Sequence, residues 1–149
     1  MSLVIRPAEP ADAVVIHGFL RGLAEHQNYA ASFKSTPADI ERELFGEAPH
    51  TYGDMALLDG AAVGVALWHY VFSSFTGRSG LYIDDLYVID AARSRGVGQA
   101  LLAELARRCA DEGLCRLEWA VRTDNDRAIA FYRSLGAGPI EEWRVFRLD

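Results

Sequence analysis

At residues 93–100 the chain reads Arg93-Ser94-Arg95-Gly96-Val97-Gly98-Gln99-Ala100, a basic loop that follows a predicted strand and opens a predicted helix. The unpaired amides and the positive dipole end of a helix start converge on one point, which favours an anion. Gly96 and Gly98 let the backbone approach a diphosphate, while Arg93 and Arg95 add positive charge. A tight turn with two solvated arginines is the simpler alternative.

Two other kinds of phosphate-binding loop share features with this stretch. A dinucleotide-binding loop is suggested by Gly96-x-Gly98 and by Glu118, which lies where a ribose-binding acid is expected. Leu101 replaces the third glycine of that pattern, a hairpin meander precedes the loop, and too little chain follows it for a dinucleotide fold. A Walker loop is excluded because no Gly-Lys-Ser/Thr follows.

Downstream of the loop the pattern alternates helices and strands. A helix with a buried stripe through Leu101 and Leu105 ends at Gly113. The remaining predicted elements are a strand over Arg116 to Val121, a helix over Asp124 to Leu135 and a last strand over Glu142 to Leu148.

Upstream of the loop the pattern is antiparallel. The predicted elements are a strand over Leu3 to Arg6, a helix from Asp12 to about Gln27, a helix from Thr36 to Phe45, and strands over Tyr52 to Leu58, Ala61 to Phe72 and Leu81 to Ile89. Asp59-Gly60 predicts a tight hairpin between two of these strands. The fold expected is a single α/β (α+β) domain over residues 1–149, with a mixed, mostly antiparallel sheet in the order β-α-α-β-β-β-α-β-α-β(-β), where the last strand is optional.

Composition narrows the function further. The chain has 149 residues, 50% of them hydrophobic, and a formal net charge of −6. It can therefore build a core, but it has no basic field for general nucleic-acid binding. Because no apolar run approaches the ~18 residues of a membrane span and no signal peptide is recognisable, a cytoplasmic protein without membrane partners is expected. Four histidines and two cysteines form no metal-ligand pattern.

Two motifs together resemble the GNAT superfamily of acetyl-CoA-dependent N-acetyltransferases. The first is Arg93-x-x-Gly96-x-Gly98 after a strand that ends Asp85-Leu-Tyr-Val88, and the second runs from Asn125 through Phe131-Tyr132 to Gly136-Ala137. The likeness covers essentially the whole chain. Within the superfamily, residues 80–88 and the closing Trp-Arg-Val-Phe of residues 143–146 resemble the spermidine/spermine and thialysine N-acetyltransferase branch.

The resemblance implies an acyl-CoA N-acyltransferase fold in which two central strands splay apart. The loop amides would hold the pyrophosphate of acetyl-CoA, and the pantetheine arm would lie in the gap between the strands. The cofactor-binding residues implied are Leu86, Tyr87, Val88, Arg93, Ser94, Arg95, Gly96, Val97, Gly98, Gln99, Asn125, Ala128 and Tyr132. For Asn125 an ordinary role in the first helical turn remains the alternative.

The same resemblance nominates the acid and the base of acetyl transfer. Tyr132 suits the donor to the leaving thiolate, because a phenol with a pKa of ~10 stays protonated at neutral pH; a core tyrosine is the alternative. Asp84 corresponds to a glutamate of the polyamine branch that acts on the amine through water. On a regular strand Asp84 and Asp85 face opposite sides, so only one reaches the cleft unless a bulge changes the phase.

The acceptor pocket is the least specified part. Asp85, Gln27 and Phe75 are the substrate-binding candidates besides Asp84. Gln27 replaces a carboxylate expected in polyamine enzymes, which argues against a long polycation. The expected function is transfer of an acetyl group to a primary amine of a small molecule by a homodimer. An acyl-CoA-binding regulatory domain without turnover and a protein or peptide N-acetyltransferase are the alternatives.

Overall fold

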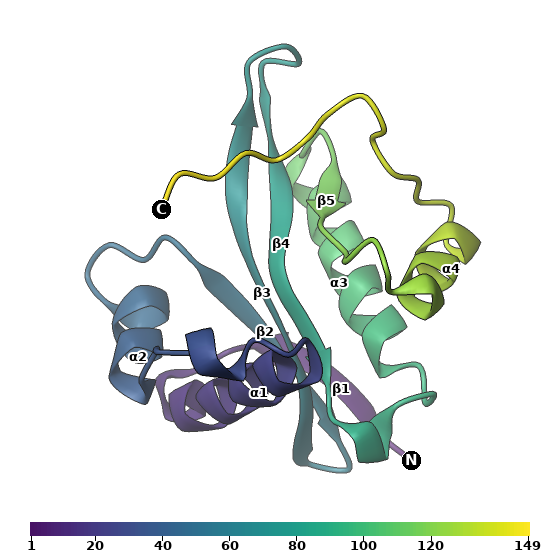
Figure 1. Ribbon diagram of the computed structural model, residues 1–149. Helices are drawn as coiled ribbons and strands as arrows, with labels where there is room; N and C mark the ends of the chain where they lie inside the picture. The colour runs from purple at the N-terminus through teal and green to yellow at the C-terminus, as the bar shows by residue number, and fades with distance from the viewer. The chain divides into compact units, whose positions relative to one another are not determined.

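The computed structural model describes all 149 residues, which divide into two compact units, Met1–Trp119 and Ala120–Asp149. The first unit contains a five-stranded sheet and three α-helices (Figure 1). The second contains one α-helix and the C-terminal segment. The predicted α/β class and the mostly antiparallel sheet are confirmed, whereas the single domain over residues 1–149 stays a prediction.

The sheet follows the order β1-β2-β3-β4-β5. Its strands are β1 (Leu3–Pro7), β2 (Tyr52–Leu58), β3 (Ala61–Ser73), β4 (Arg78–Val88) and β5 (Leu117–Trp119). The first four pair antiparallel in sequence order, and β5 runs parallel to β4. The predicted hairpin at Asp59-Gly60 is confirmed, and both residues adopt positive φ angles (51° and 85°), as a type I′ turn requires.

Helices cover both faces of this sheet. They are α1 (Ala13–His26), α2 (Pro37–Phe45) and α3 (Val97–Glu112), with short 3-10 turns at Pro10–Asp12, Ala30–Ser32 and Asp90–Ala92. At the start of α2 the predicted cap is confirmed, because the Thr36 hydroxyl accepts the Asp39 amide and the Asp39 carboxylate accepts the Thr36 amide.

The alternation of side chains along β3 separates the two helical layers. Val65 and Leu67 lie in one core cluster with Ile16 of α1 and Leu44 of α2. Gly64, on the opposite face, is close to α3: a Cβ atom at Gly64 would lie 3.4 Å from Val97 Cγ1. Odd-numbered residues of β3 from 65 onward therefore face α1 and α2, and even-numbered residues face α3.

The second unit contains α4 (Asp126–Ser134) and a segment from residue 137 to the C-terminus without regular structure. The predicted strand over Glu142 to Leu148 is wrong. Its apolar side chains suggested a strand, but the backbone forms no ladder with another segment, and Trp143, Val145 and Phe146 are 74%, 93% and 90% exposed.

None of the helices combines the length and the apolar character needed to cross a membrane.

Candidate active site

A β-bulge in β4 brings two carboxylates to one side of the sheet. Asp85 pairs with Leu67 and Ile83 pairs with the next residue of β3, Trp68, so Asp84 is the extra residue. Asp85 therefore shares the α1 face with Leu67. Asp84 contacts His69, which lies two residues beyond Leu67 and on the same face. The bulge therefore changes the alternation of side chains along β4, which the sequence alone could not decide, and both aspartates lie on the α1 face.

Asp84 lies within hydrogen-bond distance of an imidazole. Its Oδ2 atom lies 2.8 Å from Nδ1 of His69, and both side chains are about one-third exposed, at 33% and 36%. The His69 ring also packs against Tyr82, with ring centroids 5.5 Å apart. Tyr82 pairs across to Glu118 of β5, whose carboxylate is bound by Arg116 at 2.9 Å. An acidic cluster with one imidazole therefore lies at the bulge.

Asp85 differs from Asp84 because it has no hydrogen-bond partner in the protein. Burial, with a smaller contribution from the neighbouring charge of Asp84, raises the pKa of Asp85 to about 6. An unpaired, mostly buried carboxylate is costly in a fold, and such groups concentrate at functional sites.

We expect Asp85→Asn to stabilise the protein at pH 8. The folded-state pKa of Asp85 lies above the unfolded value, so its contribution to stability is fully present below about pH 4 and is lost as the pH rises through 6. Removing the charge should raise the free energy of unfolding by about 1 to 2 kcal/mol at pH 8 and by much less at pH 4.5. Urea titration at both pH values checks this, and an equal loss at both would contradict it.

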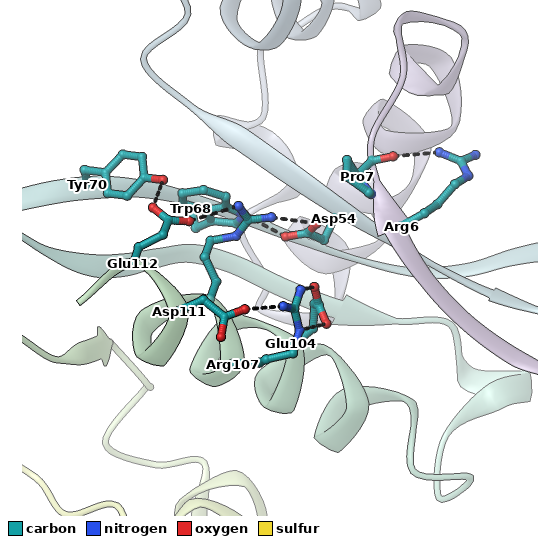
Figure 2. Close-up of polar contacts among 10 residues, drawn as sticks. Arg6, Pro7, Asp54, Trp68, Tyr70, Glu104, Arg107, Asp111 and Glu112 are labelled. Carbon is teal, nitrogen blue, oxygen red and sulfur yellow. Dashed lines mark hydrogen bonds and ion pairs between the residues drawn. The ribbon is translucent and has the colours of Figure 1, made fainter. Parts of the chain in front are cut away.

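A polar network on the α3 face surrounds Trp68, which pairs with Ile83 beside the bulge (Figure 2 shows the network). The Trp68 indole donates to the buried carboxylate of Asp54 at 2.8 Å, and the Arg108 guanidinium lies 4.8 Å from the Trp68 ring centroid. Glu112 binds Arg108 at 3.2 Å and accepts the Tyr70 hydroxyl at 2.6 Å. Burial raises the pKa of Asp54. These contacts hold the side chain of Trp68, the β3 residue that pairs with Ile83 next to the extra residue Asp84.

The glycine loop has the geometry of an anion site. Gly96, the residue before α3, has φ +78° and provides no side chain to cap the helix, so the amides of the first turn have no capping group. Arg93 binds back to its own loop, donating from Nε to the Val88 carbonyl at 3.1 Å and pairing with Asp90 at 3.0 Å. Arg95 is exposed. Arg93 thus shapes the loop and Arg95 presents charge to solvent.

The edge of β4 beside the loop is unpaired beyond the bulge. The ladder with β5 covers only Leu81 to Ile83, whereas β4 continues to Val88. The predicted cofactor residues Leu86, Tyr87 and Val88 all lie in this unpaired stretch. Tyr87 packs against Phe19 of α1, with ring centroids 5.9 Å apart, and a Cβ at Gly22 would come within 2.7 Å of the Tyr87 hydroxyl.

In the second unit, α4 carries the other predicted residues. The Asn125 side-chain oxygen caps α4 by accepting the Ala128 amide at 3.2 Å, which leaves the Nδ2 group of Asn125 to donate. Ala128 and Tyr132, four residues apart, share a helix face. Partial burial raises the pKa of Tyr132.

The other two predicted substrate residues lie outside β4. Gln27 is the C-cap residue of α1. Phe75 lies in the turn between β3 and β4 and is 99% exposed. Arg78, the first residue of β4 after that turn, is six residues from Asp84, or roughly 20 Å along an extended strand. The hairpin therefore does not bring Phe75 to the two carboxylates.

His69 and Tyr82 are the site residues that sequence reasoning missed. From the sequence, His69 was only a possible metal ligand without a matching pattern. A regular hairpin register counted back from the β3–β4 turn pairs His69 with Tyr82. Tyr82 is two residues before Asp84, so this register would have indicated that His69 lies near the acidic pair.

Comparison with known proteins gives a consistent picture. The profile of the Acetyltransferase (GNAT) family matches residues 19–137. Thialysine N-epsilon-acetyltransferase of Sus scrofa is 28% identical, with 99% of this chain and 93% of that protein covered. L-ornithine N5-acetyltransferase of Arabidopsis thaliana is 36% identical over 74% of this chain and 45% of that protein. An integron cassette protein of V. cholerae shares the fold, with a TM-score of 0.84, 24% identity, and coverage of 100% and 93%.

Proposed function

The chain belongs to the GNAT acetyltransferase family and is an N-acetyltransferase, and on that premise we propose that it moves an acetyl group from acetyl-CoA to a primary amine of a small cationic molecule. A diamine, a polyamine or a lysine-like compound has this chemistry. The observation that carries the proposal is the bulge, which gathers Asp84 and Asp85 on one face of the sheet. Their negative charge favours a cationic acceptor.

The start of α3 fits the pyrophosphate of acetyl-CoA. Gly98 is helical, and a Cβ there would meet no protein atom closer than Val88 Cγ2 at 4.0 Å. The fold therefore does not require glycine at this position. Because Gly98 has no side chain, a diphosphate can approach the backbone closely and accept hydrogen bonds from the uncapped amides of the first turn.

We expect Gly98→Ala to stabilise the protein and to weaken coenzyme A binding. Alanine lowers the conformational entropy cost of the helix, worth about 0.5 to 1 kcal/mol, while its methyl group occupies space that the diphosphate needs. Calorimetric titration with coenzyme A, with thermal unfolding of the free protein, measures both effects. Gly18→Ala is the matched control, because Gly18 lies within α1 with no atom within 4 Å of its Cβ position. That variant should gain stability and bind normally; unchanged binding by Gly98→Ala would contradict the site.

The reaction needs two proton transfers, one from the amine and one to the leaving thiolate, and a different residue is assigned to each. The acetyl thioester supplies an electrophilic carbonyl and a thiolate leaving group. The amine must lose a proton before it attacks, and we assign Asp84 to help remove that proton. The Tyr132 hydroxyl would donate to the thiolate, since its raised pKa keeps the phenol protonated at neutral pH. Backbone and side chains from Leu86 to Gln99, with Asn125, would orient the cofactor for direct attack in a ternary complex.

A panel of amines tests the acceptor class. Coenzyme A thiol release from acetyl-CoA would be followed with lysine, thialysine, ornithine, diamines, polyamines, aminoglycosides and peptide N-termini. The proposal predicts selective turnover of small cationic amines. Turnover of peptides alone would favour a protein acetyltransferase, and coenzyme A binding without any turnover would favour a regulatory domain; either result contradicts the proposal.

We also propose that the protein is a homodimer. The exposed apolar side chains of the C-terminal segment, Trp143, Val145, Phe146 and Leu148, support an interface there. Sedimentation equilibrium should give twice the mass of the chain, whereas a monomer at micromolar concentration would contradict this.

A further inference from the structure

One imidazole lies within the acidic cluster of the bulge. His69 contacts Asp84 through Nδ1 at 2.8 Å, and its ring packs against Tyr82. The Nε2 atom of His69 makes no hydrogen bond to the protein, and 36% of the side chain is exposed. The second ring nitrogen therefore has no partner in the protein.

The contact with Asp84 determines which nitrogen carries the proton. A carboxylate accepts hydrogen bonds and cannot donate them, so Nδ1 of His69 must be the donor. In the neutral imidazole the lone pair is then on Nε2. This arrangement turns the imidazole into an oriented base, and it places a negative charge where the imidazolium formed by protonation would be stabilised.

The other groups that face His69 are less suited to take up a proton. On β4, partial burial raises the pKa of Tyr82, which stays a neutral phenol. On β5, Glu118 is paired with Arg116. Asp85, also on β4, has no partner and is the rival acceptor. Its unpaired charge equally suits contact with the ammonium group, and that role leaves the proton to the imidazole.

We propose that Nε2 of His69 accepts the proton of the bound ammonium, with Asp84 orienting the imidazole and Asp85 holding the positive charge. The N–H bond of the ammonium breaks and an Nε2–H bond forms, which gives a neutral amine and an imidazolium paired with Asp84. The imidazolium then releases its proton to water. This inference rests on the proposed function and specifies how Asp84 contributes to it.

Two substitutions separate proton transfer from positioning. His69→Asn keeps a donor near Nδ1 for Asp84 but has no basic nitrogen, and His69→Ala removes both. The amine used is the best acceptor of the wild-type protein. Both variants should lose about 100-fold in kcat with the KM for the amine within threefold, and free imidazole should partly restore His69→Ala. Asp85→Asn should instead raise the KM for the amine more than it lowers kcat. His50→Ala, at an exposed histidine outside the cluster, is the control.

Rescue by free imidazole gives a readout that a structural role would not move. Added imidazole should increase kcat of His69→Ala, where it can replace the lost base, and should leave kcat of the wild-type protein unchanged. Near-normal activity of His69→Asn, or no response of His69→Ala to imidazole, would overturn the proposal. Absence of any turnover by the wild-type protein would instead refute the proposed function.

Discussion

Asp84→Asn is expected to lower kcat by about 100-fold or more while the protein stays folded. The substitution keeps the shape of the side chain at the bulge but removes the charge that faces Nδ1 of His69 at 2.8 Å. General-base assistance typically contributes 10²- to 10⁴-fold to a rate, and an amide cannot stabilise the imidazolium formed when the amine loses its proton. The KM for the amine should change little, because Asp85 retains its charge.

Steady-state kinetics with a saturating cationic amine measures this loss. Glu47→Gln is a suitable control, since it removes an exposed carboxylate after α2, outside the acidic cluster, and should leave kcat unchanged. Activity of Asp84→Asn within threefold of the wild-type value would show that the bulge carboxylate takes no part in proton removal.

Tyr132→Phe should lower kcat by a similar factor, about 100-fold, without weakening coenzyme A binding. The change removes one hydroxyl group and preserves the ring, whose centroid lies 5.5 Å from that of Phe131. Because partial burial raises the pKa of Tyr132, the phenol stays in its acid form through neutral pH and can donate to the departing thiolate.

A second tyrosine provides the control for this substitution. Tyr52→Phe removes a hydroxyl from a ring stacked on Trp68, with centroids 4.9 Å apart, and should leave the rate unchanged. Equal kcat values for Tyr132→Phe and the wild-type protein would remove Tyr132 from the role of acid.

Features with a local signature were predictable from the sequence. The Asp59-Gly60 hairpin, the Thr36 cap of α2 and the glycine loop before α3 each depend on residues a few positions apart, and each is present. The acidic pair was identified, but its geometry was not. A bulge depends on the register between two strands, so Asp84 and Asp85 could not be assigned to one face from their own positions.

Features that depend on distant partners were missed. His69 became a site residue only through its pairing across β3 and β4, because nothing in its own neighbourhood distinguishes it from a solvated histidine. The strand expected at Glu142 to Leu148 failed for a related reason: apolar side chains favour a strand, but a strand also needs a partner for its backbone.

The most direct test of the central claim is the stoichiometry of transfer to a lysine-like or diamine acceptor. Purified protein, acetyl-CoA and the amine would be incubated together, with thiol release and N-acetylated product measured in the same samples. The account predicts one acetylated amine for each thiol released, with both signals reduced about 100-fold in Asp84→Asn and Tyr132→Phe. Thiol release without an acetylated amine, or equal product from the wild-type protein and both variants, would contradict it.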